Sequence, residues 1–234
     1  MRDCIISSRI LPVAAKTLLL ASNSPRRQQL LTMGGWVFDI AYSRIDEYLL
    51  PCEPPASYVL RLAQTKARAS ARQAKNGNII IAADTIVVDD EDILGKPVDQ
   101  AEARFMLQRL RGHAHKVYTG IAVLCPGDDR LLTDLCVTEV FMRSYSDEEI
   151  EAYVQTGDPL DKAGAYAIQH PSFQPVEHID GCYASVMGLP LCHLERSLFK
   201  MDCPSVTNVP DNCQSGLHYQ CPVYPSILRA IQAG

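Results

Sequence analysis

The sequence contains no apolar run that approaches the ~18–20 residues of a membrane-spanning helix, so we expect no integral membrane protein and no membrane partner. It also lacks internal repeats and low-complexity blocks. Hydrophobic and charged residues make up 47% and 21% of the 234 residues, which excludes wholesale disorder and a fibrous protein. These absences indicate a globular chain with one large domain or two small ones.

Positive charge is not in excess. Lys and Arg number 22 against 27 Asp and Glu, for a net charge of −5, and this balance argues against a nucleic acid polymer as partner. An anionic ligand would therefore need a local basic cluster. The nine cysteines form no C-x-x-C pair, so the usual zinc and thioredoxin signatures are absent. We interpret them as free thiols in a reducing compartment, with a disulfide or metal role in the C-terminal part as the alternative.

Residues 1–16 have no apolar core segment, so we expect no secretory signal in them. We expect a cytoplasmic protein with a short extension over residues 1–15, although an organelle-targeting role for that extension stays open. Residues 16–199 are expected to form the main domain. Residues 200–234 are rich in Cys and Pro and predict an irregular tail.

Strand and helix signals alternate along the main domain. Apolar runs, capping residues and Gly or Pro breakers predict strands at 17–21, 36–42, 79–83, 86–88, 116–124 and 131–142, and helices at 25–33, 54–75, 99–110, 146–157 and 189–199. A polar break at Asp84-Thr85 separates two of these strands. The order predicts an α/β fold with a mixed central sheet.

The first candidate site is the segment Ser22-Asn-Ser24-Pro-Arg26-Arg27, which joins a strand to a helix capped by Ser24. Free N–H groups and the helix dipole favour an anion there, and arginine recognises phosphate oxygens with two hydrogen bonds. An ordinary capped helix with solvated arginines is the equally weighted alternative.

Further candidates are scattered along the chain. Asp84 follows an IIIAA strand at the expected carboxyl edge of the sheet, where a buried carboxylate needs a metal, a cation or N–H groups. Lys96 lies in a Gly-Lys-Pro segment that fails as a phosphate-binding P-loop. Lys162 and Gln169 flank a run of small residues, and Glu47 is a possible second acid. Each of these alone is also compatible with a turn, a tight loop or a surface charge.

Taken in order, these segments resemble the Maf family of nucleotide pyrophosphatases over residues 16–199. The matching stretches are ASNSPRRQQLL (21–31), RIDE (44–47), YVLRLAQTKA (58–67), IIAADTIVVDD (80–90), LGKP (94–97), GHAHKVYTG (112–120), YVQTGDPLDKAGAYAIQ (153–169) and GCYASVMGLPL (181–191).

The resemblance implies hydrolysis of a nucleoside triphosphate between its α and β phosphates, with Mg²⁺ or Mn²⁺ as cofactor. It implies an elongated Maf/ITPase-like α/β fold in which a central mixed sheet is flanked by helices and two lobes enclose the nucleotide cleft. The segments resemble the branch that acts on dTTP and UTP more than the branch that acts on 7-methyl-GTP. A homodimer is compatible with it.

Residue roles carry over from the resemblance position by position. The proton acceptor carries over onto Asp84, and Glu47 is the second acid beside it; both are expected to hold the metal. Specificity positions carry over onto Arg26, Thr85 and Gln169. Phosphate and metal contacts carry over onto Ser22, Ser24, Arg27, Glu47, Lys66, Lys96 and Lys162. The chain departs from the family at His170-Pro171, where glycine is usual, and this concerns the loop that holds Gln169.

Two other functions compete with this one. A nucleotide-binding regulator of cell division or septum formation would bind without turnover, but it needs no proton acceptor such as Asp84. A thiol-redox or metal module built on the C-terminal cysteines would leave the cations of the main domain unexplained. Because every candidate site segment precedes residue 200, we expect the tail to be dispensable for catalysis.

Overall fold

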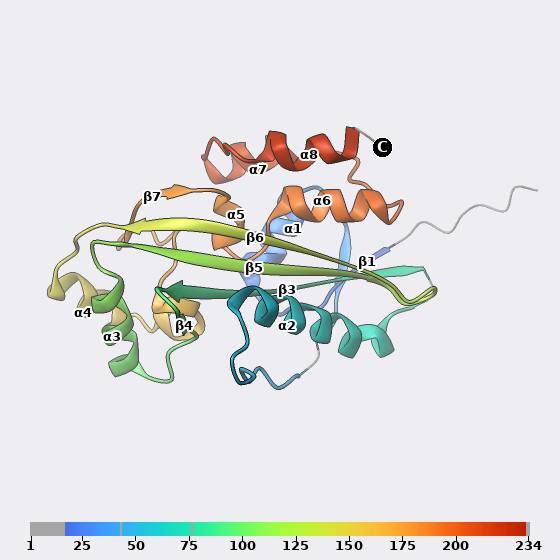
Figure 1. Cartoon of the computed structure of the whole chain (residues 1–234). Coiled ribbons are helices and arrows are strands. Elements are labelled where there is room, and N and C mark those ends of the chain that lie inside the picture. Colours follow the sequence, from blue (N-terminus) through green and yellow to red (C-terminus); the bar gives the residue numbers. More distant parts are fainter. Residues whose placement is uncertain (1–16, 43, 76, 233–234) are drawn as a thin grey trace, which may run out of the picture.

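The computed structural model describes residues 17–42, 44–75 and 77–232, so the extension expected at residues 1–15 lies outside the described residues. A seven-stranded mixed sheet runs the length of the molecule, with helices on both faces (Figure 1). Its order is β2–β1–β3–β5–β6–β7, with β4 paired to β3. The strands are β1 (Thr17–Leu20), β2 (Phe38–Ile40), β3 (Asn78–Asp89), β4 (Asp92–Leu94), β5 (Ala114–Cys125), β6 (Arg130–Met142) and β7 (Val176–Asp180).

The helices of the described residues are α1 (Pro25–Met33), α2 (Pro55–Ser70), α3 (Gln100–Leu110), α4 (Asp147–Gln155), α5 (Tyr183–Val186), α6 (Leu191–Lys200), α7 (Val209–Leu217) and α8 (Tyr224–Gln232). Five of them, α1 to α4 and α6, correspond to predicted helices, and the expected α/β fold with a mixed sheet is confirmed. Short 3-10 helices occupy 71–73, 158–161 and 163–165. The predicted capping residue Ser24 accepts from the backbone N–H of Arg27, and a full capping box opens α4 at Ser146.

The predicted break at Asp84-Thr85 is wrong. β3 is one continuous strand of 12 residues, and β5 pairs with it from Ile80 through Val88. The two polar side chains do not end the strand because each has a buried partner, as described below. Asp84 therefore lies in the middle of a strand and not at its carboxyl end.

One edge of β3 is only partly covered. The parallel strand β1 pairs with it up to Ile81, and the antiparallel strand β4 begins at Val87. Within the described chain, residues 82–86 of β3 thus have β5 on one side and no strand on the other. This interruption in the sheet places Asp84 and Thr85 beside the loop that follows β1.

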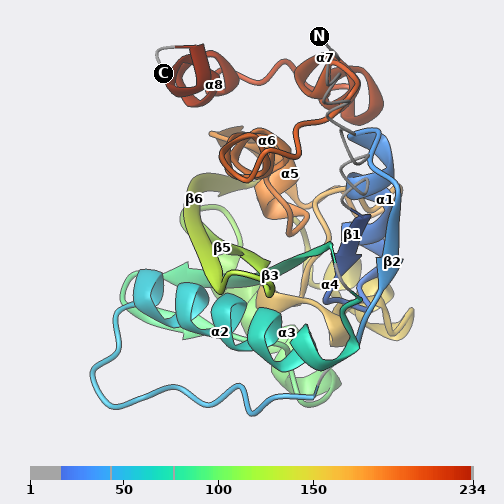
Figure 2. The same ribbon diagram turned by 90° about the vertical axis from the view of Figure 1, so that its right-hand side faces the viewer.

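The two faces of the sheet have separate cores. On one face, Ala63 and Ala67 of α2 pack against Ile80 and Ala82 of β3. On the other face, α1, α5 and α6 cover the neighbouring residues of the same strand, and α7 and α8 lie outside α6 (Figure 2). A further cluster around α3, α4 and the far ends of β5 and β6 forms the second lobe. None of the helices in the described residues is long and apolar enough to cross a membrane.

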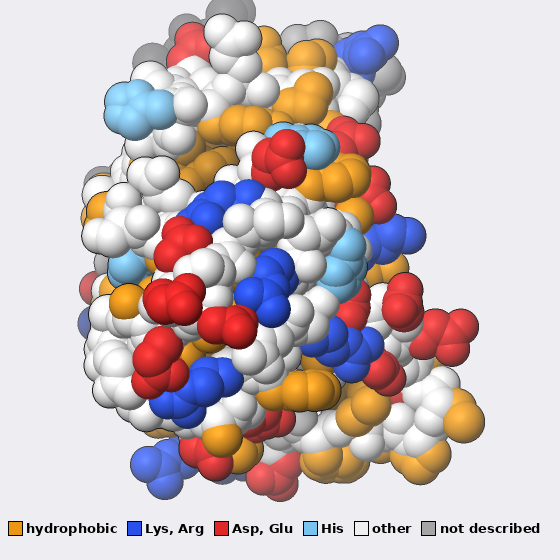
Figure 3. All heavy atoms as spheres, turned by 90° about the vertical axis from the view of Figure 1, so that its left-hand side faces the viewer, with side chains coloured by type: hydrophobic (Ala, Val, Ile, Leu, Met, Phe, Trp, Pro, Cys, Tyr) orange, Lys and Arg blue, Asp and Glu red, His pale blue; other side chains and the backbone are white. Residues whose placement is uncertain are grey.

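Acidic and basic side chains alternate on the end of the molecule formed by α3 and α4 (Figure 3). Its arginines are paired with carboxylates: Arg104 with Glu151 at 2.5 Å and Arg111 with Asp147 at 2.8 Å. The protein therefore already neutralises these cations, whereas a surface that is preformed for an anion would leave its cations unpaired.

The expectation of an irregular tail is wrong, because α7 and α8 fold against the main domain. Val209 and Cys213 of α7 join the core cluster that contains α1 and α6, and Ile227 of α8 is also buried. The hydroxyls of Ser205 and Thr207 donate to the carbonyl oxygen of Gly34, at 3.0 and 2.9 Å. Each tail helix has only 9 residues, so its apolar pattern is too short to be recognised in a proline-rich segment.

Docking of the tail predicts unequal effects for two valines. Val209 is 1% exposed and Val206 is 95% exposed. Replacement of Val209 by Ala should lower the free energy of unfolding by about 1–3 kcal/mol, because buried methyl groups are lost. Val206→Ala should change it by less than about 0.5 kcal/mol. Urea denaturation of both variants measures the difference, and equal effects would mean that α7 is not docked in solution.

Candidate active site

A cavity of about 690 Å³ opens beside the interruption in the sheet. Its lining comes from both lobes: the β1–α1 loop, residues 42 and 44–47 after β2, the middle of β3, and the segments at 161–169 and 186–188. The volume lies in the range of ordinary ligand pockets, ~300–1,000 Å³. The structure brings ten of the eleven predicted site residues to its wall: Ser22, Ser24, Arg26, Arg27, Glu47, Lys66, Thr85, Lys96, Lys162 and Gln169. Asp84 lies directly behind Lys66.

The start of α1 forms one wall. Ser22 Oγ accepts from the backbone N–H of Ser24 at 3.2 Å and from Arg27 Nη1 at 3.4 Å. Arg27 also donates through Nε to the carbonyl oxygen of Gly188 at 2.9 Å and through Nη2 to Thr85 Oγ1 at 3.3 Å. Three of its five N–H groups are therefore held by the protein, and two are left for a ligand.

Lys66 joins the two acids. Its Nζ lies 2.5 Å from Asp84 Oδ1 and 2.7 Å from Glu47 Oε1. Asp84 is only 6% exposed, and this burial raises the pKa of its carboxyl, while the charges of Lys66 and Arg27 act in the opposite direction. Half-burial would also raise the pKa of Glu47, but its hydrogen bond to Lys66 brings that pKa below the usual range. Of the two carboxyls, that of Asp84 therefore holds a proton more readily.

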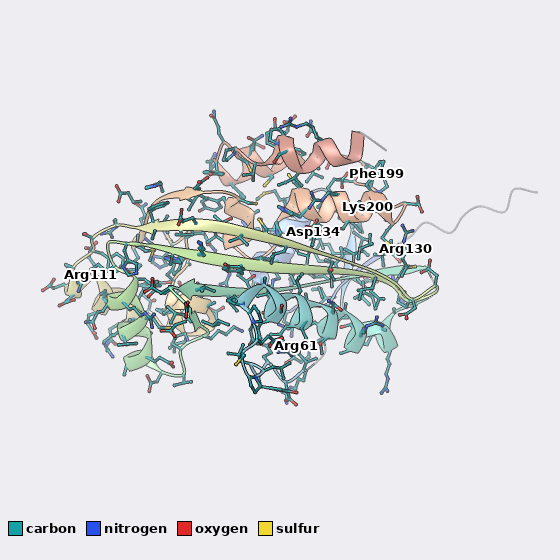
Figure 4. The ribbon with its side chains drawn as sticks, in the orientation of Figure 1. Arg61, Arg111, Arg130, Asp134, Phe199 and Lys200 are labelled. Atoms are coloured by element: carbon teal, nitrogen blue, oxygen red, sulfur yellow. The ribbon has the colours of Figure 1, made fainter. Side chains whose placement is uncertain are left out.

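The loop before α2 holds Glu47 in place. Tyr58 of α2 donates its hydroxyl to the carbonyl oxygen of Glu47 at 2.8 Å. One turn further along α2, Arg61 donates to Glu53 at 2.6 Å and to the carbonyl oxygen of Tyr48 at 2.9 Å, on the loop side of the helix (Figure 4). Helix α2 thus carries Lys66 and also fixes the loop that brings the second acid to it.

The remaining cations differ in how many partners they have in the protein and in how exposed they are. Lys162 is 6% exposed, and its three N–H groups meet the carbonyl oxygen of Asp158 and the carboxylates of Asp158 and Asp161 at 2.6–2.8 Å. Arg26 lies 3.5 Å from Asp161. Lys96 and Gln169 are exposed on the pocket wall. Lys162 can therefore reach a ligand only by giving up one of these acceptors.

His170-Pro171 does not carry the loop away from the pocket. The His170 ring packs against Tyr153 with centroids 4.7 Å apart, and its Nδ1 accepts from the backbone N–H of Phe173 at 2.9 Å. Histidine at this position therefore faces the second lobe, while Gln169 lines the cavity.

Sequence reasoning missed the residues that hold the predicted ones. The carbonyl of Gly188 orients Arg27, and Asp158 neutralises Lys162. Arg44 adds another cation to the pocket wall. The position of Arg44 close to Glu47 in the sequence was a usable signal. The contact between Arg27 and the Gly188 carbonyl leaves no signal in the sequence, because it depends on how two distant segments pack.

The fold and this pocket define an α/β protein with acids and cations gathered where a mixed sheet is interrupted. A family profile described as "Maf-like protein" matches residues 17–201, so the chain belongs to the Maf family. A protein of Geobacter metallireducens named dTTP/UTP pyrophosphatase is 49% identical over 184 residues, which are 79% of this chain and 95% of that protein. One of Vibrio cholerae with the same name is 43% identical over 183 residues, 78% of this chain and 97% of its own length.

Proposed function

We propose that the chain is a metal-dependent nucleoside triphosphate pyrophosphatase that hydrolyses dTTP and UTP to the monophosphate and pyrophosphate. The observation that carries this proposal is the gathering of Asp84, Glu47 and five predicted cations, from segments far apart in the sequence, around one cavity. A triphosphate with its metal needs many positive groups and a few acids, whereas a ligand with one negative charge does not. The names of the relatives support the two nucleotides.

The donor set fits a divalent metal that is completed by its substrate. Asp84 and Glu47 offer carboxylate oxygens to the same ammonium group, and the described residues contain no group of three His, Cys, Asp or Glu side chains arranged for a metal. Mg²⁺ commonly uses one or two carboxylates together with phosphate oxygens. When bound there, Mg²⁺ or Mn²⁺ would neutralise phosphate charge next to the scissile bond.

The chain's own residues then act on water and on the phosphates. Asp84 takes a proton from the water that attacks the α phosphorus, the new phosphorus–oxygen bond forms, and the α–β anhydride bond breaks to release pyrophosphate. The raised pKa of Asp84 suits it to hold this proton. Arg26, Arg27, Lys66, Lys96 and Lys162 stabilise the charge that accumulates on the departing phosphates.

A regulator of cell division that binds a nucleotide without turnover is the alternative function. It would explain the cations but not the buried carboxylate, because an acid that neutralises Lys66 weakens the binding of an anion. Release of pyrophosphate from UTP by the purified protein separates the two functions, and tight binding without any product would support the regulator.

Asp84→Asn tests the proton acceptor at nearly constant shape. We expect turnover to fall at least ~10²-fold, because both the proton acceptor and a metal ligand are lost. Asp89→Asn is the matched control, since Asp89 is a buried acid five residues along the same strand but pairs with Arg109 and His113. Pyrophosphate release per folded molecule measures the effect. An Asp84→Asn protein that keeps more than about a tenth of the turnover contradicts the assignment.

Metal removal tests the carboxylate pair. EDTA should stop turnover and added Mg²⁺ or Mn²⁺ should restore it. Glu47→Gln should raise the Mg²⁺ concentration needed for half-maximal rate, because one anionic ligand becomes neutral. Glu91→Gln makes the same change at an exposed acid in the turn between β3 and β4, which does not line the cavity, and should leave that concentration unchanged. Full activity in metal-free buffer would exclude the scheme.

Base selectivity tests the role of Gln169. Its amide combines a donor and an acceptor, which matches the adjacent N–H and C=O groups of uracil and thymine. We expect kcat/KM for UTP and dTTP to exceed that for ATP and GTP by about tenfold or more, roughly 1.4 kcal/mol.

The comparison uses one Mg²⁺ concentration for UTP, dTTP, CTP, ATP, GTP and 7-methyl-GTP. Gln169→Ala should reduce the preference, and Gln155→Ala, on the exposed face of α4, should not. A preference of the unmodified protein for purines or 7-methyl-GTP would remove the assigned roles of Thr85 and Gln169.

A further inference from the structure

A ring of hydrogen bonds runs behind the pocket and links Arg27 and Thr85 to residues that had no predicted role. Arg27 Nη2 donates to Thr85 Oγ1 at 3.3 Å, and Thr85 Oγ1 lies 2.9 Å from Thr119 Oγ1 on β5. Thr119 Oγ1 donates to the carbonyl oxygen of Ser185 at 2.8 Å. The backbone N–H of Gly188 also donates to that oxygen, at 2.9 Å, and Arg27 Nε donates to the carbonyl oxygen of Gly188. The ring therefore begins and ends on Arg27.

The direction of each hydroxyl proton follows from this ring. A threonine hydroxyl has one proton, and that of Thr119 is used on the carbonyl of Ser185. Thr119 can therefore only accept from Thr85, so the Thr85 proton points to Thr119. Thr85 is left with lone pairs alone, and one of them accepts from Arg27. Its hydroxyl has no proton to donate to a substrate.

Burial makes this arrangement rigid. Thr119 and Ser185 are both fully buried, so no solvent molecule can replace a missing partner without entering the core. Gly188 adds close packing, because a Cβ atom at this position would lie 3.2 Å from Arg27 Nε and 3.5 Å from Thr85 Oγ1. The guanidinium of Arg27 is thus held on three sides by groups whose own orientations are settled deeper in the protein.

We propose that Thr119 is a positioning residue, which turns the Thr85 hydroxyl into an acceptor and thereby holds the Arg27 guanidinium against the phosphates. The proposal rests on the proposed function, since it takes the pocket to bind a nucleoside triphosphate. Thr119 itself does not line the cavity. Without its hydroxyl, Thr85 can rotate and present its proton to the arginine, which then loses an acceptor in a buried place.

Thr119→Val tests the role because it removes the hydroxyl at nearly constant shape. We expect kcat/KM for UTP to fall about tenfold or more, in line with the loss of a hydrogen bond to a charged group. Thr119→Ser keeps the hydroxyl and should recover the activity to within about threefold. Thr138→Val is the matched control: Thr138 is fully buried on β6 and bonds to Ser185 Oγ at 2.7 Å, so its loss removes a buried hydroxyl beside the ring and none of the ring's own hydrogen bonds.

A double-mutant cycle with Thr85→Val separates positioning from packing. If Thr119 acts through Thr85, adding Thr119→Val to Thr85→Val should cost no further activity, although both changes can lower the melting temperature. Further loss in the double variant, unchanged activity in Thr119→Val, or an equal loss in Thr138→Val would each overturn the proposal.

Affinity for UTP, measured by titration calorimetry, keeps this result distinct from failure of the proposed function. Absence of pyrophosphate release from the unmodified protein would refute the pyrophosphatase alone. The same variants should then still differ in UTP affinity, in the same order. Equal UTP affinity of Thr119→Val and the unmodified protein would overturn the positioning role in that case.

Discussion

The unequal pairing of β3 is the constraint on which the site depends. β5 follows β3 over most of its length, while β1 and β4 cover only the two ends of its other edge. A strand that was paired on both edges throughout would leave no room for a ligand beside it. Here the backbone stays extended and rigid through Asp84, and the missing neighbour makes space for the loops that carry serine, arginine and glutamate.

Alternation along this strand divides the site between the two faces of the sheet. Asp84 belongs to the face that packs on α2, where Lys66 meets it, and Thr85 belongs to the opposite face, where Thr119 meets it. The pair of Asp84 with Lys66 and the hydrogen bonds that hold Arg27 thus belong to two different cores. The two cores meet only at the interruption in the sheet, which explains how the adjacent residues Asp84 and Thr85 have separate partners.

Local signals predicted some of the elements that line the pocket. The serine cap and proline that open α1 act over a few residues, so they place Arg26 and Arg27 in its first turn whatever the rest of the chain does. The polarity of Asp84 led to the wrong prediction of a strand break. Its buried ion pair with Lys66 makes a charged residue compatible with a central strand, and Lys66 lies on a separate element, α2. The capture of Lys162 by Asp158 and Asp161 is local, yet a cation near small residues looks the same from sequence whether it is free or paired.

The tail follows residue 201, where the match to the family ends, and it packs against the far end of α1. Its hydroxyls bind the carbonyl of Gly34 at the C-terminal end of α1, and Gly216 of α7 packs closely on Met33. The opposite end of α1 presents its arginines to the pocket. A helix of nine residues is only marginally stable alone, so contacts at its far end contribute to the order of its first turn. The tail therefore supports the end of α1 that lines the pocket from a distance, although it supplies none of the predicted site residues.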